Sequence, residues 1–189
     1  MSEKNYRTQI RAAVRGLWTG AFTFEDFSKA MKSTINRGMT QAWIEGAKPC
    51  GITFDDLSDA ELQALDAMIL GQYTYIEGFR DFVDANSKVN KGKLGQGLAR
   101  AELWSNRYGE ARNQAKAMAC SDKKLKWQIN AKCREHCKSC TRLNGKVKRG
   151  SYWQKTIMPR SRNLECGGWR CCCDLVPTDD PISKGKVSF

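Results

Sequence analysis

Cysteine is the residue type whose number and spacing in this sequence point most clearly to chemistry. Of the nine cysteines, seven fall within a stretch of 41 residues near the C-terminus. One pair has the spacing Cys137-x-x-Cys140, and a later set reads Cys166-x-x-x-x-Cys171-x-Cys173. A C-x-x-C segment can place two thiolates on one tight turn, where both sulfurs reach a single ion at about 2.3 Å. The sequence therefore predicts a metal site made by two cysteine-bearing turns that face each other.

The thiolate ligands indicate which metal the site would hold. Four thiolates at tetrahedral positions select zinc over magnesium or calcium, which prefer oxygen ligands. Because protein side chains would fill every ligand position, the zinc is expected to be structural and to activate no water. Gly167 and Gly168 let the chain turn sharply beside the second set. The candidate ligands, the first four preferred, are Cys137, Cys140, Cys166, Cys171 and Cys173. The substitutes that stay open are Cys133, His136 and Cys172.

Three other uses of these cysteines remain open beside zinc. Disulfides are disfavoured because nine is an odd number, the N-terminus lacks the layout of a signal peptide, and a reducing cytosol would break them. The C-x-x-C pair could also be a redox motif, but the strand and helix pattern of a thioredoxin-like site does not surround it here. An iron–sulfur cluster would also use several thiolates. Outside this stretch, Cys50 and Cys120 are expected to be buried or idle thiols.

Catalysis is not expected from the other residue types. His136 is the only histidine in the chain, which excludes zinc proteases and metal-dependent nucleases that need paired histidines. The adjacent carboxylates Asp55-Asp56 and Asp179-Asp180 are typical of solvated turns. The sequence thus predicts a protein that is not an enzyme and has no small-molecule substrate.

The positive charge of the sequence follows the cysteines. Residues 1–120 carry 16 Lys and Arg against 14 acidic residues, whereas residues 121–189 carry 16 against 6, so most of the formal +12 lies in the second part. Such cations can contact nucleic-acid phosphates, and aromatic side chains among them can stack on exposed bases. In an equally open interpretation, the aromatic side chains form a small core and the basic side chains lie on its solvated surface. The basic residues are Lys123, Lys124, Lys126, Lys132, Arg134, Lys138, Arg142, Lys146, Lys148, Arg149, Lys155, Arg160, Arg162 and Arg170; the aromatics are Trp127, Tyr152, Trp153 and Trp169.

The elements that precede this region are predicted to be helical. Apolar residues recur every three or four positions through most of the first 120 residues, which is typical of amphipathic helices. A capping box at Ser58-Asp59-Ala60-Glu61 opens the longest pattern. Residues 86–97 are basic, contain glycine and have few apolar side chains, which indicates an exposed loop or hinge. The predicted helices cover about residues 3–17, 24–45, 62–85 and 98–119.

A different period begins after residue 120. Leu125, Trp127 and Ile129 alternate with polar residues, as in a strand with one buried face. Asn144-Gly145, flanked by apolar residues, predicts a β-hairpin. Leu175-Val176 is expected to form a closing strand.

Together these patterns predict an α+β protein, with a helical N-terminal region followed by a small zinc-ribbon-like C-terminal β region. Residues 1–120 are expected to be a helical protein-interaction region, with an exposed loop at about 86–97. Residues 121–189 are expected to be a basic, cysteine-rich zinc-binding region, too small to fold on an apolar core without the metal. No window reaches the roughly 18 consecutive apolar residues of a membrane helix, so no membrane partner is expected.

Motifs along about residues 98–177 resemble those of a known family. They are Trp127, Cys137-Lys138-Ser139-Cys140, Leu143-Asn144-Gly145-Lys146-Val147, Pro159, and Cys171 to Cys173 followed by Leu175 and Pro177. In order and type they resemble the head morphogenesis domain of Mu F-like phage minor head proteins. That family has C-x-x-C, then L-x-G-x-V, a proline, a histidine and a C-R-C near the end. Here Cys166 stands in place of the histidine, and the spacing to the final pair is longer.

The resemblance implies a place and a set of partners. Members of that family are virion or procapsid components found in few copies, associated with the portal and implicated in head assembly or DNA passage. It therefore implies a structural protein, made in the host cytoplasm, that acts with portal and capsid proteins in head assembly and DNA packaging or ejection. The basic region would then contact packaged DNA non-specifically. The alternative left open by the residues is a cytosolic zinc-ribbon regulator that binds nucleic acid.

Overall fold

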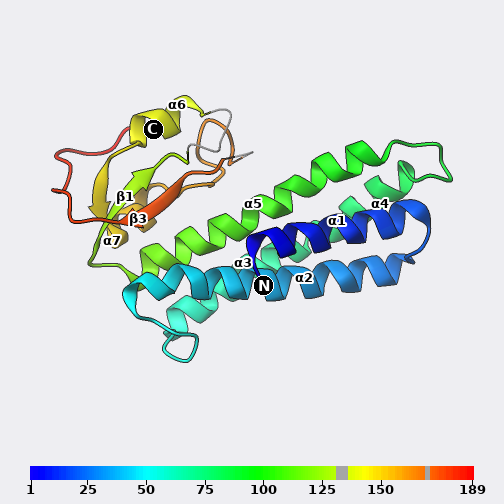
Figure 1. Ribbon diagram of the computed structural model, residues 1–189, viewed down its shortest axis with the longest axis horizontal. Helices are drawn as coiled ribbons and strands as arrows, with labels where there is room; N and C mark the ends of the chain where they lie inside the picture. The colour runs from blue at the N-terminus through cyan, green and yellow to red at the C-terminus, as the bar shows by residue number, and fades with distance from the viewer. Residues whose placement is uncertain (131–135, 169–170) are drawn as a thin grey trace.

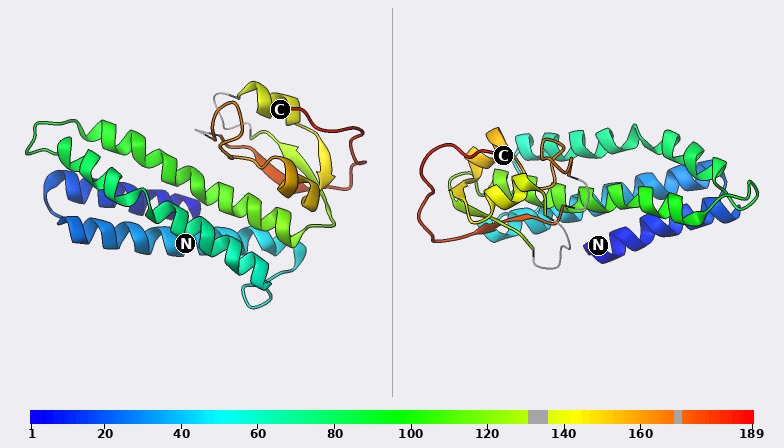
Figure 2. Two further views of the ribbon diagram at one scale, coloured as in Figure 1. Left: turned by 180° about the vertical axis from the view of Figure 1, so that it is seen from behind. Right: turned by 90° about the horizontal axis from the view of Figure 1, so that it is seen from above.

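Helices from the first 119 residues form an elongated bundle, and a small sheet lies beside its last helix (Figure 1, Figure 2). The computed structural model describes residues 1–130, 136–168 and 171–189. None of the helices in these ranges is long and apolar enough to cross a membrane. The bundle helices are α1 (Glu3–Thr19), α2 (Phe24–Ala47), α3 (Asp59–Tyr73), α4 (Ile76–Ala85) and α5 (Leu94–Ala119), with a 3-10 turn η1 (Lys48–Cys50) after α2.

Side-chain caps fix where the first three bundle helices begin. Ser2 accepts a backbone N–H at the start of α1. Thr23 and Asp26 form a reciprocal capping box at α2. Ser58 and Glu61 form the predicted box at α3. Each cap satisfies backbone N–H groups that have no partner inside the helix.

The predicted apolar stripes form the core of the bundle. As expected from its small residues, α5 packs closely, and Ala111 and Ala115 are fully buried. α2 approaches it closely at Gly46, where a Cβ would lie 2.1 Å from the carbonyl oxygen of Arg112. The largest fully buried side chains of the bundle include Trp43, Tyr6, Tyr108, Phe27 and Phe79.

The stripe predicted as one long helix is in fact two helices, α3 and α4. Between them, Thr74 Oγ1 donates to the carbonyl oxygen of Gly71 at 3.0 Å. A hydroxyl that bonds a nearby carbonyl competes with the helix's own hydrogen bonds. Ile76 and Phe79 beyond the break remain buried. The apolar period therefore continues across the break, which is why the sequence pattern does not reveal it.

The predicted loop at 86–97 is shorter than expected, because α5 begins at Leu94. Residues 88–91 are exposed, in agreement with the prediction. Gly97, however, is buried within α5, and a Cβ there would lie 3.1 Å from Cγ1 of Val14. A glycine that suggested a loop in the sequence thus serves close packing of two helices.

The part that follows the bundle holds a three-stranded antiparallel sheet in the order β2-β1-β3. Its strands are β1 (Lys124–Gln128), β2 (Val147–Arg149) and β3 (Asp174–Pro177), and the chain also forms the short helices α6 (Lys138–Leu143) and α7 (Gly150–Thr156). The alternation predicted for β1 is confirmed, because Leu125 and Trp127 are fully buried. The predicted closing strand is β3, where Leu175 pairs with Trp127. A mixed helix and sheet fold is therefore confirmed.

The predicted hairpin at Asn144-Gly145 is wrong. β1 and β2 do pair antiparallel, but α6 precedes the Asn-Gly turn in place of a strand. The turn still meets β1, since the Gly145 N–H donates to the carbonyl oxygen of Trp127 at 2.8 Å. Cys137 caps the start of α6, so the cysteine motif sets up a helix where the turn signal alone suggested a strand.

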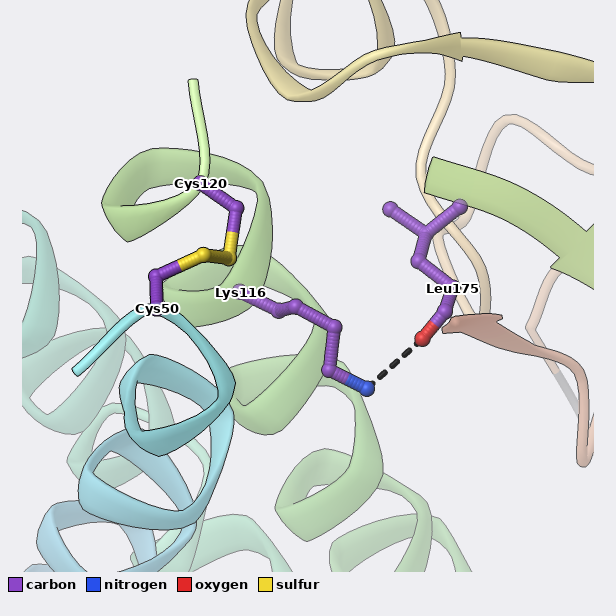
Figure 3. Close-up of a disulfide and its surroundings, with 4 residues drawn as sticks. All are labelled: Cys50, Lys116, Cys120 and Leu175. Atoms are coloured by element: carbon purple, nitrogen blue, oxygen red, sulfur yellow. Dashed lines mark hydrogen bonds between the residues drawn. A yellow bond between two sulfur atoms is a disulfide. The ribbon is translucent and has the colours of Figure 1, made fainter. Parts of the chain in front are cut away.

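The sheet is attached to the bundle through polar contacts with α5. Asn113 of α5 is fully buried, and its Oδ1 accepts the Leu175 N–H at 2.7 Å. Lys116 Nζ donates to the carbonyl oxygen of Leu175 at 2.6 Å, as Figure 3 shows. Arg112 pairs with Asp174 at 2.9 Å. Both backbone groups of one β3 residue are therefore held by α5, which fixes the sheet against the bundle.

A disulfide joins Cys50 to Cys120, with the two Cα atoms 5.6 Å apart (Figure 3). The expectation of two idle thiols is wrong. Cys50 ends η1 and Cys120 directly follows α5, so the bond ties the end of α2 to the point where the chain leaves the bundle for the sheet. Seventy residues separate the two cysteines, and sequence alone does not give such a connectivity.

Removal of this disulfide by Cys50→Ala is expected to destabilise the protein by about 2–4 kcal/mol, because a long cross-link restricts the unfolded chain. Thermal unfolding with and without the reductant TCEP measures the effect. Reduction should lower the Tm of the wild type more than that of Cys50→Ala, which keeps only the disulfide of Cys172. A wild type that melts like Cys50→Ala under oxidising conditions would contradict the prediction.

Candidate metal centre

Five thiols from separate segments converge in the C-terminal part. Their sulfurs form two overlapping groups, one of Cys137, Cys140 and Cys166 and one of Cys140, Cys171 and Cys173, with all sulfurs of a group within 4.8 Å of one another. Cys140 belongs to both groups, so its sulfur lies within 4.8 Å of each of the other four. The structure thus brings together all five residues that the sequence nominates.

The spacing and chemistry of this thiol cluster suit a thiophilic ion. The sulfurs of Cys140 and Cys171 lie 3.7 Å apart, and two ligands of a tetrahedral ion bound at 2.3 Å would be about 3.8 Å apart. Among the described residues, no carboxylate or imidazole joins either group. A donor set of sulfur alone favours zinc, or another soft ion, over calcium and magnesium.

The first turn of the cluster is built by α6. Cys137 has an extended backbone before the helix, and its Sγ accepts the Cys140 N–H at 3.4 Å. One residue is therefore both the N-cap of α6 and a candidate ligand. Because Cys140 lies in the first helical turn, its thiol is held on the same side as that of Cys137, as the C-x-x-C spacing predicts.

The second turn is built by two glycines in the left-handed region of backbone space. Gly167 has a φ of 59° and Gly168 a φ of 74°, conformations that a residue with a Cβ adopts only with strain. A Cβ at Gly168 would also lie 2.1 Å from the carbonyl oxygen of Arg160. The sharp turn predicted beside Cys166 is confirmed.

Polar contacts join the two turns to each other. The Lys138 N–H donates to Glu165 Oε2 at 2.7 Å, and the Glu165 N–H donates to Ser139 Oγ at 3.2 Å. The residues next to the candidate ligands are thus bonded across the gap. This arrangement holds the turns at the separation that a shared ion needs.

Backbone N–H groups surround the sulfurs of Cys137, Cys166 and Cys171. Such groups stabilise a thiolate, the form in which cysteine binds a metal. They compensate for part of the cost of burying negative charge in this small core. The N–H groups that bond these sulfurs belong to Cys140, Arg160, Cys166, Gly168 and Cys173.

The thiols also change one another's acidity. Hydrogen bonds from Cys140 and Cys173 lower the pKa of Cys171 to about 2. The same contacts raise the pKa of Cys140, because its thiol donates to its neighbours. Burial raises the pKa of Cys166 to about 11. These shifts follow from thiols close enough to share protons, which a divalent cation would replace.

A tryptophan contributes a contact that the sequence did not predict. The Trp127 Nε1–H is buried without a hydrogen-bond partner, and it lies near enough to the Cys173 thiol to favour the thiolate. A donor that hydrogen-bonds to a metal ligand orients and stabilises that ligand. The contact supports Cys173, which the sequence analysis had ranked fifth. The period-two pattern placed Trp127 on the buried face of a strand but gave no sign of its sulfur partner.

No substitute ligand among the described residues joins the converging thiols. His136 is exposed and belongs to neither sulfur group. Cys172 is disulfide-bonded and offers no thiolate. Cys133 lies outside the described residues, as do Trp169 and the basic residues at 132, 134 and 170. The five thiols are therefore the candidate ligands that the described part of the chain provides.

Comparison with protein-family models, with curated proteins and with solved structures found no match to this chain.

Cys140→Ser is expected to abolish stoichiometric metal binding, because Cys140 is shared by both sulfur groups. The measurement is elemental analysis of protein purified without added zinc, with Cys50→Ala as the control that changes a cysteine outside the cluster. The wild type and the control should each hold one zinc per chain. Stoichiometric zinc in Cys140→Ser would contradict the assignment.

Trp127→Phe is expected to weaken zinc binding about tenfold or more, because it removes the N–H that favours the Cys173 thiolate. Competition with a chromogenic chelator measures the affinity. Trp153→Phe is the matched control, since Trp153 is equally buried but its Nε1–H donates to the carbonyl oxygen of Leu125 at 2.9 Å. Equal affinities in the two variants would show that the indole N–H does not act on the metal site.

Proposed function

We propose that this protein is a non-enzymatic minor head component of a phage, with a zinc-stabilised C-terminal part that contacts DNA. The observation that carries the proposal is the five-thiol cluster, whose 3.7 Å sulfur separation suits a tetrahedral ion. The motif order that resembles phage head morphogenesis proteins supplies the cellular setting. Zinc would stabilise the fold and activate no water, because protein side chains would fill every ligand position.

A structural role for zinc is supported by the composition of the second core. Trp127 and Trp153, with ring centroids 5.5 Å apart, are its largest side chains. Three of the cluster's cysteines are buried directly against this core. Structural zinc contributes about 10–16 kcal/mol in small zinc-finger peptides. A core of this size is expected to depend on that contribution.

The proposed DNA contact relies on cations and not on aromatic stacking. Trp127 and Trp153 are 0% exposed, so neither can receive a base. Lys148 is turned inward, where Nζ donates to the carbonyl oxygens of Ser183 and Gly185. Exposed cations without base-reading neighbours contact phosphates without sequence preference. Among the described residues from 121 to 189, the exposed basic ones are Lys123, Lys138, Arg142, Lys146, Arg149, Lys155, Arg162, Lys184 and Lys186.

Two observations favour the head component over a cytosolic zinc-ribbon regulator. The sheet is bonded to α5 through Asn113 and Lys116, whereas a regulator's DNA-binding module would be expected to dock independently. The Cys50–Cys120 disulfide suits a particle that leaves the cell, since disulfides persist on virions and are rare in cytosol. In this proposal the bundle contacts portal and capsid proteins, and the protein resides in the virion or procapsid.

The test is whether the protein becomes part of assembled heads. Sedimented heads from infected cells should contain it in few copies per particle, detected by quantitative mass spectrometry with the portal protein as the reference. Its absence from heads, together with abundant free protein, would contradict the proposal and favour the regulator.

DNA binding is expected to be electrostatic and confined to the basic part. Neutralising four of its cations should reduce the slope of log K against log salt by about 3 to 4, at roughly 0.9 per phosphate contact. A filter-binding titration with two unrelated duplexes measures the slope. An equal effect of the control set would contradict the assignment. The test set is Lys123, Lys146, Arg149 and Lys155, each to Gln, and the control set is Lys4, Arg15, Lys29 and Lys88 on the bundle, each to Gln.

A further inference from the structure

A cavity of about 390 Å³ lies outside the metal centre, between the helical bundle and the turn that precedes β3. Small-molecule sites typically measure 300–1,000 Å³. The residues of its wall that matter here are Tyr75, Gly78, Arg100, Trp104, Arg107 and Arg162. Most of them come from α4, α5 and the α3–α4 junction, so the cavity belongs mainly to the bundle.

The wall of this cavity is strongly positive. It holds three arginines and, among the described residues, no carboxylate. Arg107 is neutralised by an ion pair with Glu110 behind the wall. Arg100 instead lies over the Phe82 ring at 4.6 Å, and Arg162 bonds the Tyr75 hydroxyl from both of its terminal nitrogens at 3.3 Å. Neither Arg100 nor Arg162 forms an ion pair within the described part of the chain, although the Glu110 carboxylate lies close enough to Arg162 to interact with it electrostatically.

The cavity wall also has a buried donor without an acceptor. Trp104 is 5% exposed, and its Nε1 is buried without a hydrogen-bond partner. Because this nitrogen has essentially no accessible surface, a ligand in the cavity does not reach it. The charged groups of the wall without an ion pair in the described part of the chain are the guanidiniums of Arg100 and Arg162. A partner that would satisfy both guanidiniums is an anion rich in oxygen.

We propose that this cavity binds a phosphate monoester on a nucleoside, either a free mononucleotide or the 5′ end of a nucleic-acid strand. Arginine forks match phosphate oxygens in bidentate geometry. The exposed Tyr75 ring in the wall offers a surface for a base. The cavity holds a ligand of nucleotide size and no duplex. The site uses no thiol of the cluster, but it shares Gly167 of the second turn and the exposed cation Arg162 with the function proposed above.

The binding test uses adenosine 5′-monophosphate, adenosine and inorganic phosphate with the full-length protein. Isothermal titration, with tryptophan fluorescence as a second readout, should show one saturable site for the monophosphate. Adenosine should bind about tenfold or more weakly, since it lacks the charge-assisted hydrogen bonds. No saturable binding of the monophosphate at millimolar concentration, or equal binding of adenosine, would overturn the proposal.

Two pairs of variants test whether binding depends on the cavity or only on the positive charge of the protein. Arg162→Gln should weaken binding about tenfold or more. Arg15→Gln removes the same charge from an exposed position of α1 and should change the affinity less than twofold. Gly78→Leu should fill the cavity without harming the fold, because a Cβ at Gly78 meets no atom within 4 Å. Gly71→Leu is its control, with equal space outside the cavity wall. Binding that survives Gly78→Leu in folded protein would overturn the proposal.

Oligonucleotides distinguish the two sources of the phosphate. A single strand with a 5′ phosphate is compared with the same strand lacking it and with the mononucleotide. Tighter binding of the phosphorylated strand than of the mononucleotide identifies a strand end as the ligand. Tighter binding of the mononucleotide identifies a free nucleotide. Equal binding of both strands, unaffected by Arg162→Gln, would contradict a site for the terminal phosphate.

Discussion

The convergence of five thiols around Cys140 is the constraint on which the C-terminal part of this protein depends. One turn offers Cys137 and Cys140, and the other thiols come from a segment that begins 26 positions later with Cys166. Thiolates placed this close repel one another unless protons or a cation lie between them. A divalent ion would remove the repulsion and join the two segments. The small apolar core beside them would then need to supply less of the folding free energy.

The same region is tied to the bundle at several independent points. Asn113 and Lys116 satisfy both backbone groups of Leu175. The Cys50–Cys120 disulfide holds the end of α5, from which the chain enters β1. Hydrogen bonds and a disulfide thus act on neighbouring segments, beside the thiol cluster that could hold a metal ion. The result is a basic surface carried on a rigid base, an arrangement suited to a component built into a larger assembly.

Sequence reasoning worked where the signal is local. The three- and four-residue period predicted the bundle helices, the alternation predicted β1, and the C-x-x-C spacing predicted the convergence at Cys140. It failed where a tertiary contact decides. Pairing of Cys50 with Cys120 depends on where two helices end in space, and the Trp127 contact with Cys173 depends on side-chain orientation. Two local signals precede β2. Asn144-Gly145 predicts a hairpin with a strand before the turn, whereas Cys137 caps the helix α6, and the helix is what forms.

The proposed metal centre is defined by the atoms that surround its ion. X-ray absorption at the zinc K-edge, measured on protein purified without added metal, identifies those atoms without mutation. We expect a shell of four sulfur atoms at about 2.3 Å. A shell of oxygen or nitrogen atoms, or no zinc edge at all from folded protein, would contradict the metal centre.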